Sequence, residues 1–313
     1  MKNIKFYNIW KDRSFRVSII LSFVFLTVGF AFLHFGWEVY GWALFVFFPI
    51  VLGAAIGVLP NRKTAIPGFI ITFIVFLVTL IFFGLEGIVC VILCLPILAP
   101  FFFLGAIVIH LIKRFKEIKG EINLKVTIIP LFLFLIAVPI ENSLSDNKKE
   151  VIEVSTEIVL PYTPNQVFDA IKSVDTLIAE KPFLMKLDLP VPHKCILEKE
   201  EVGALRICYF EGGRIIERVT EFKRGEVLRM DVIDYELTGR NWLGFEEAIY
   251  LFEPIGLDSC KMTRITTYTS ELYPRAYWEP LEKIGIQQEH EFVFSNLERD
   301  LSNLNDNTTD NDF

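Results

Sequence analysis

Arg206 is a charged residue set within an apolar pattern, so it could act on a ligand. It alternates with Leu205 and Ile207 along an expected strand. If its face of the strand points into the protein interior, the guanidinium could pair with a carboxylate or phosphate group. The alternatives are a solvated outer face or an ion pair with Glu217.

His290 lies on the apolar stripe of the C-terminal segment, with Ile286, Val293 and Leu297. A histidine facing a pocket could act as an acid or a base, whereas a hydrogen-bonded helix histidine is the structural alternative. Four aromatic residues could add a polar tip to an apolar pocket, or could belong to a plain core. They are Tyr209, Tyr250, Tyr268 and Trp278, and with Arg206 and His290 they form the predicted set of ligand-pocket candidates.

No catalytic or metal-binding motif accompanies these residues. The sequence has no Gly-rich phosphate loop, no His/Cys cluster and no convincing Ser-His-Asp order. Asp231 and Asp234 face opposite sides of an expected strand, so they do not form a catalytic pair. We therefore assign no catalytic residue, and we expect no metal and no cofactor.

The five cysteines leave the disulfide pattern open. Cys90 and Cys94 fit small residues of a helix bundle. Cys195, Cys208 and Cys260 are scattered through the C-terminal half. One pair of these three could be bridged if that half lies outside the cytoplasm, with one thiol left over.

The elements that must position the candidates begin after a polar linker. Val151–Leu160 predicts a strand, and Asn165–Val174 predicts a helix, followed by a second short helix and a Pro-rich stretch. Helical spacing returns from Trp278 to Leu304. Between the Pro-rich stretch and this last helix, turn residues separate six expected strands: His193–Lys199, Ala204–Phe210, Arg214–Phe222, Val227–Tyr235, Gly244–Phe252 and Lys261–Tyr268.

This order predicts an α+β domain in which a curved antiparallel sheet wraps a long C-terminal helix, with a cavity between them. It resembles the SRPBCC superfamily, the START-like helix-grip proteins, and especially its polyketide cyclase/dehydrase-like branch. The resemblance covers residues 151–304. It is carried by EVSTEIVLPYTPNQVFDAI as first strand and helix, VGALRICYFEGGRIIERVTEFKRGEVLRM as middle hairpins, and YWEPLEKIGIQQEHEFVFSNL as closing helix.

The resemblance implies a cavity for an apolar small molecule. Members of the superfamily bind lipids, sterols, polyketides or plant hormones. Some are enzymes, and many are carriers or sensors. Because a fold does not assign a function by itself, the resemblance leaves the ligand and any reaction open.

The N-terminal half predicts a membrane domain of about five transmembrane helices. Each of its five apolar stretches approaches the ~20 residues that cross a bilayer. They are Val17–Phe35, Trp42–Leu59, Ile66–Phe83, Gly87–Ile112 and Ile122–Ile140. The fifth is the weakest, because its uncharged run, Val126–Ile140, is short and contains two prolines.

Basic residues alternate between the segments that flank these stretches. Lys and Arg precede the first stretch and separate the second from the third and the fourth from the fifth, whereas the other two loops have none. Since basic loops are retained in the cytoplasm, we expect a cytoplasmic N-terminus. A fifth crossing would then put the C-terminal domain outside the cytoplasm, and the architecture suggests a bacterial inner membrane.

Charge and composition separate the two halves. Residues 1–150 contain 14 Lys and Arg and 8 Asp and Glu, net +6, whereas residues 151–313 contain 17 and 30, net −13. So acidic a domain is not expected to bind nucleic acid. We expect a membrane domain over 1–140, a linker over 141–150, the START-like domain over 151–304 and a disordered tail over 305–313.

Together these features predict a membrane-anchored module that binds a hydrophobic small molecule or lipid in a helix-grip cavity. The expected partners are the lipid bilayer and that apolar ligand. Two alternatives remain open. One is a cyclase- or hydratase-like enzyme on an apolar substrate, with His290 or a tyrosine as acid or base and Arg206 orienting the substrate. The other is a structural or signalling membrane protein that binds another protein.

Overall fold

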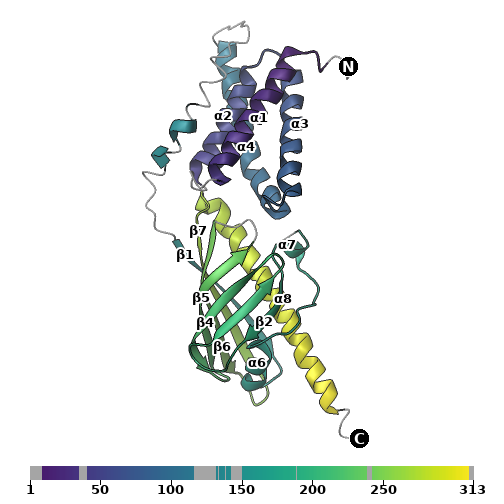
Figure 1. The fold of residues 1–313 in the computed structure, drawn as a ribbon, viewed down its shortest axis with the longest axis vertical. Coiled ribbons are helices and arrows are strands. Elements are labelled where there is room, and N and C mark those ends of the chain that lie inside the picture. The colour runs from purple at the N-terminus through teal and green to yellow at the C-terminus, as the bar shows by residue number, and fades with distance from the viewer. Residues whose placement is uncertain are drawn as a thin grey trace. The chain divides into compact units, whose positions relative to one another are not determined.

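The computed structural model describes residues 9–34, 41–115, 132, 134–137, 139–141, 150–187, 189–237 and 242–309. The chain divides into two compact units (Figure 1). The first, here the helical unit, comprises Met1–Lys148 together with Glu271–Trp278. The second, here the sheet unit, comprises Lys149–Ser270 together with Glu279–Phe313.

Four apolar helical segments make up most of the described part of the helical unit. They are α1 (Arg13–His34), η2 continued by α2 (Ala43–Phe47 and Phe48–Val58), α3 (Arg62–Phe82) and α4 (Ile88–Phe115). Three of them, Arg13–Phe32, Arg62–Phe82 and Ile88–Phe115, are long and apolar enough to cross a membrane.

The second predicted crossing is shorter than expected from the sequence. The π-helix η2 has 5 residues and α2 has 11. Leu59 leaves the helical conformation, with φ −59° and ψ 142°, because the following Pro60 disfavours a helical residue before it. The fifth predicted crossing, Ile122–Ile140, lies mostly outside the described residues.

Glycines of α2 and α4 let these two helices pack closely against each other. A Cβ added at Gly53 would lie 1.9 Å from the carbonyl oxygen of Phe102, and one added at Gly105 would lie 2.0 Å from that of Ile50. The backbones of α2 and α4 therefore approach as closely as small residues allow.

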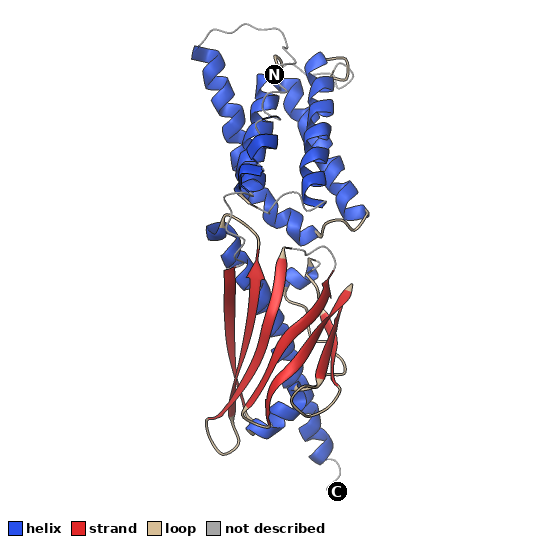
Figure 2. Ribbon diagram, turned by 60° about the vertical axis from the view of Figure 1, so that its left-hand side comes forward, coloured by secondary structure: helices blue, strands red, loops and turns tan. Residues whose placement is uncertain are grey.

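The sheet unit is a seven-stranded antiparallel sheet with the long helix α8 packed against it (Figure 2). The strand order is β1-β7-β6-β5-β4-β3-β2, so the first strand pairs with the last. This architecture confirms the predicted helix-grip fold class. The strands are β1 (Glu150–Leu160), β2 (Pro192–Leu197), β3 (Leu205–Phe210), β4 (Gly213–Lys223), β5 (Val227–Leu237), β6 (Leu243–Pro254) and β7 (Cys260–Ser270).

Three helices complete this part of the chain: α6 (Pro164–Ile171), α7 (Phe183–Lys186) and α8 (Arg275–Thr309). Helix α6 begins with a capping box, in which the Thr163 hydroxyl accepts from the Gln166 N–H and the Gln166 side chain accepts from the Thr163 N–H. Helix α8 continues to Thr309, into the segment predicted as a disordered tail, because no glycine or proline after Gly285 interrupts it.

The core of the sheet unit lies between the sheet and α8. Phe168 of α6 packs against Phe252 of β6, with ring centroids 5.3 Å apart, and α8 contributes Phe292, Val293 and Leu297 to the same buried cluster. Strand alternation selects which residues join it, because every second side chain faces the helix.

Candidate functional site

Two charged side chains lie on the buried faces of their strands, at positions where apolar residues would be expected. On β3, Arg206 shares the buried face with Cys208, and on β4, Glu217 lies between the buried residues Ile215 and Val219. Arg206 and Glu217 are 3% and 6% exposed. Arg206 is therefore buried rather than solvated, and it forms the ion pair with Glu217 that the sequence analysis gave as the alternative to a ligand contact.

The geometry around Arg206 satisfies each of its nitrogens. Nη1 donates to Glu217 Oε2 at 2.7 Å. Nε and Nη2 donate to the carbonyl oxygens of Lys172 at 3.1 Å and Ile171 at 3.4 Å. These carbonyls end helix α6, where the helix dipole favours a cation.

A second arginine lies beside the first. Arg264 of β7 donates through Nη2 to Glu289 Oε1 on α8 at 3.1 Å, and the same nitrogen forms an ion pair with Glu289 Oε2 at 2.8 Å. The Tyr250 ring of β6 lies near both arginines, with its centroid 5.8 Å from the Arg206 guanidinium carbon and 5.4 Å from that of Arg264. We call these five residues, Arg206, Glu217, Tyr250, Arg264 and Glu289, the interior arginine cluster.

Both arginines are held in the charged form. Burial by itself would lower the pKa of Arg206, but the Glu217 carboxylate and the Tyr250 hydroxyl raise it above its usual value. Burial also opposes the charge of Arg264, yet Glu289 and Tyr250 raise its pKa. The cluster thus contains two cations and two carboxylate partners inside an apolar core, which is stable only because each charge has a close partner.

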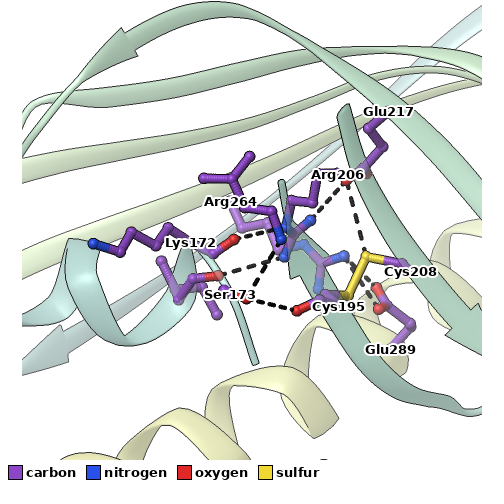
Figure 3. The surroundings of a disulfide bond; sticks show 10 residues. Lys172, Ser173, Cys195, Arg206, Cys208, Glu217, Arg264 and Glu289 are labelled. Atoms are coloured by element: carbon purple, nitrogen blue, oxygen red, sulfur yellow. Dashed lines mark hydrogen bonds and ion pairs between the residues drawn. A yellow bond between two sulfur atoms is a disulfide. The ribbon is translucent and has the colours of Figure 1, made fainter. Parts of the chain in front are cut away.

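A disulfide adjoins the cluster and resolves the pairing that the sequence left open (Figure 3). Cys195 of β2 is bonded to Cys208 of β3, and the two are directly opposite in register. Cys195 exchanges both backbone hydrogen bonds with Val174, each 2.8 Å. It therefore forms a non-hydrogen-bonded pair with Cys208, and the Cα atoms are 4.0 Å apart. Cys260 is a buried free thiol.

His290 is enclosed at the same interface of sheet and helix. Its side chain is fully buried, with Nε2 2.7 Å from the Thr266 hydroxyl and Nδ1 2.9 Å from the Thr156 hydroxyl. Burial, with the Arg264 charge nearby, lowers the pKa of His290 to about 2. The imidazole is therefore neutral, and both nitrogens have hydroxyl partners, as expected for the hydrogen-bonded alternative.

The other candidates are distributed more widely. Tyr268 is fully buried, and its hydroxyl donates to the Glu282 carboxylate at 3.3 Å. The same carboxylate accepts from the Ser270 hydroxyl at 2.6 Å. Tyr209 is 40% exposed on the outer part of β3. Trp278 belongs to the helical unit, where its ring packs 4.8 Å from Phe45. The structure therefore brings Arg206, Tyr250 and His290 to one interior and does not bring Tyr209 or Trp278 there.

Arg264, Glu289 and the two threonines were missing from the predicted set. Arg264 and Thr266 could have been found from strand alternation, because they follow Met262 at every second position on the inward face of β7. The intervening residues, several of which are Thr, hide this alternation in the sequence. Within the described residues, no group of three or more His, Cys, Asp or Glu side chains is placed to hold a metal ion.

Comparison with known proteins gives structural neighbours only. No protein-family model matches the sequence, and no curated protein matches it. Solved structures similar to the chain include a START superfamily protein from Mycobacterium smegmatis, with 12% identity over 49% of this chain and 98% of that one and a TM-score of 0.35.

Two enzymes are among the neighbours. The Zhui aromatase/cyclase from a Streptomyces species is 12% identical over 48% of this chain and 95% of that one, with a TM-score of 0.33. Norcoclaurine synthase from Thalictrum flavum is 12% identical over 48% of this chain and 94% of that one, with a TM-score of 0.32. All three likenesses concern about half of the chain.

Proposed function

We propose that this protein is a membrane-anchored module that binds a hydrophobic small molecule or lipid between its sheet and helix α8. The observation that carries the proposal is the interior arginine cluster. A purely structural core gains little from two buried arginines, since apolar residues of similar volume are usually at least as stabilising. A few convergent polar groups within apolar walls are instead typical of sites that orient an apolar ligand.

Binding is favoured over the enzymatic alternative by the state of His290. A general acid or base works best with a pKa near the working pH. The pKa of His290 is lowered to about 2, and its two nitrogens already contact Thr156 and Thr266. His290 is therefore better suited to join α8 to the sheet than to transfer a proton.

Contacts at the two ends of α2 support the membrane topology within this proposal. Lys113, near the end of α4, donates to the carbonyl oxygens of Gly57, at 3.2 Å, and Val58, which end α2. Glu141 accepts from the N–H groups of Trp42 and Ala43, at 2.7 and 2.6 Å, where the segment begins. Lys113 and Glu141 thus lie at opposite ends of the bundle, as a further crossing between them requires.

The disulfide supports a location of the sheet unit outside the cytoplasm. Disulfides persist in oxidising compartments and are rare in the cytoplasm. A Cys195–Cys208 bond therefore fits a C-terminal domain outside the cytoplasm, as the alternation of basic loops predicts. In such an arrangement the anchor keeps the domain near the bilayer, from which a poorly soluble ligand could be supplied.

The test is to identify small molecules that the full chain retains through purification in a nonionic detergent. We expect mass spectrometry of the extracted protein to find an apolar compound in near-stoichiometric amount. Ala248→Leu adds bulk at a buried position of β6 in the same cluster as Tyr250, and should reduce the retained amount several-fold. Glu246→Leu, at an exposed position of the same strand, is the matched control.

The proposal would be wrong if the wild-type protein retained nothing beyond the bulk lipid carried by its micelle. It would also be wrong if Ala248→Leu, Glu246→Leu and the wild type retained identical amounts while all three remained folded. Either result would shift attention to a protein partner.

A further inference from the structure

Arg264 has hydrogen-bond donors that no described residue satisfies. Its Nη2 atom donates to Glu289, but Nε and Nη1 are buried and have no partner in the described part of the chain. These two nitrogens carry three N–H bonds. A buried charged donor without an acceptor is costly, and such a group in a native protein calls for a specific explanation, such as a ligand.

Neighbouring side chains do not supply the missing acceptor. Arg206 carries only donors and so cannot accept from Arg264, and His290 has both ring nitrogens engaged by threonines. Glu217 accepts from Arg206 at 2.7 Å. Arg264 is therefore the member of the interior arginine cluster with spare donor capacity (Figure 3).

The charges of the cluster indicate what kind of acceptor fits. Arg206 and Arg264 are matched by the carboxylates of Glu217 and Glu289, in two ion pairs of 2.7 and 2.8 Å. A third carboxylate would leave the cluster with an excess negative charge in a region of low dielectric, where an unbalanced charge is expensive. A ketone or ester carbonyl accepts from the free N–H bonds and leaves the balance unchanged.

We infer that Arg264 binds the uncharged carbonyl oxygen of an otherwise apolar ligand, an inference that rests on the proposed binding function. The Tyr250 ring and Met262, which precedes Arg264 on the same face of β7, would contact the apolar part beside that carbonyl. Arg264 is thus a specificity-determining residue that selects a carbonyl over both a bare hydrocarbon and a carboxylate.

The test uses the full chain in detergent and three probes with the same number of carbon atoms: decyl methyl ketone, dodecanoate and dodecane. The ketone carries a ¹³C carbonyl, so isotope-edited infrared spectra isolate its stretching band. In the wild type we expect a second band at lower frequency, from the carbonyl bound to Arg264. We also expect the ketone to bind about tenfold or more tightly than dodecane, and more tightly than dodecanoate.

Variants assign that signal to Arg264. Arg264→Met should remove the shifted band and the preference for the ketone, while dodecane binding persists. Arg218→Met makes the same substitution at an exposed position, and should leave both unchanged. Because Arg264→Met strands the Glu289 carboxylate, the double variant Arg264→Met/Glu289→Met removes the ion pair as a whole and serves if the single variant does not fold.

The outcomes separate this inference from the proposed function. If ketone and dodecane bind equally and no shifted band appears, water satisfies Arg264 and the inference is overturned. Tighter binding of dodecanoate overturns it in favour of an anion site. If none of the three probes binds, the proposed function itself fails.

Discussion

His290 joins helix α8 to two strands through one hydroxyl contact at each imidazole nitrogen. Thr156 on β1 and Thr266 on β7 each place a hydroxyl within 3 Å of one imidazole nitrogen, at 2.9 and 2.7 Å. Because these strands are neighbours at the edge of the sheet, one side chain ties the first strand, the last strand and the closing helix together. Protonation would place a second positive charge beside Arg264.

This arrangement predicts acid sensitivity with a defined sign. The pKa of His290 is about 2 in the folded protein, against an ordinary value of 6.5. Between these two pH values only the unfolded state binds the proton. The contribution of neutral His290 to the free energy of unfolding is therefore complete above pH 6.5 and is lost as the pH falls. The expected slope is about 1.4 kcal/mol per pH unit, or roughly 2 kcal/mol between pH 6.5 and 5.

The measurement is denaturant unfolding of the sheet unit in the full chain at several pH values. His290→Gln should flatten the slope in that window, although it lowers stability at pH 7. His193→Gln, at an exposed histidine, should retain the wild-type slope. An unchanged slope in His290→Gln would show that His290 is protonated in the folded state as readily as in the unfolded state.

Two pairs of elements depend on close approach, and they do so by different means. Helices α2 and α4 approach through glycine, with Gly53 against Phe102 and Gly105 against Ile50. Strands β2 and β3 are joined covalently by the disulfide at the edge of the sheet, where β2 has only one neighbouring strand. The glycine contact between α2 and α4 has no room for an added carbon atom. The disulfide between β2 and β3 can be broken by a reductant.

Gly53→Ala should therefore lower the thermal stability of the helical unit. The new Cβ would lie 1.9 Å from a backbone oxygen that cannot move without shifting α4, and overpacking of this kind costs about 1–3 kcal/mol. Gly57→Ala, whose nearest contact is at 3.2 Å, should cost less. Gly285→Ala in α8 meets nothing within 4 Å and should be stabilising by up to about 1 kcal/mol. Equal melting temperatures for Gly53→Ala and Gly57→Ala would contradict this packing.

Opening the disulfide should destabilise the sheet unit. Its cysteines are 13 residues apart, and a cross-link closing a loop of this size contributes about 3 kcal/mol in the chain-entropy account. Reductant should thus lower the denaturation midpoint of the wild type. The Cys195→Ser/Cys208→Ser protein should start at the lower midpoint and not respond to reductant, which makes it the control. A wild-type midpoint that ignores reductant would argue against a contribution of the bond.

At the scale of the whole molecule, the helical and sheet units differ in the solvent to which they are suited. Residues 1–150 have a net charge of +6 concentrated in alternate loops, whereas residues 151–313 have a net charge of −13. An apolar helical unit whose basic residues fall in alternate loops is typical of a membrane domain. An acidic sheet unit with a disulfide fits the oxidising compartment that we propose for it.

Reporter fusions test this separation. Alkaline phosphatase, which is active only outside the cytoplasm, should be active when fused after Phe313 and inactive when fused after Lys63. A fluorescent protein that matures only in the cytoplasm should give the reverse pattern at the same two positions. An inactive phosphatase after Phe313, with a fluorescent partner fusion, would mean that the segment before Glu141 does not cross.

Local patterns in the sequence were sufficient for the secondary structure and the fold class. Strand alternation, turn residues and helical spacing each depend on near neighbours along the chain, so seven strands and a long closing helix could be predicted. The same locality limits how well the ends of elements can be placed. Helix α2 ends at Val58, one residue before the end of the second apolar stretch, and α8 ends at Thr309, within the segment that we predicted as a tail.

The composition of the site was decided by the tertiary structure. The sequence by itself determined that Arg206 would alternate with apolar neighbours and that His290 would lie on the apolar stripe of a helix. It could not determine that Arg264 pairs with Glu289, that Cys195 bonds to Cys208, or that Trp278 belongs to the helical unit. These pairings depend on strand register and on the rotation of α8 against the sheet, which are set by packing between segments far apart in the chain.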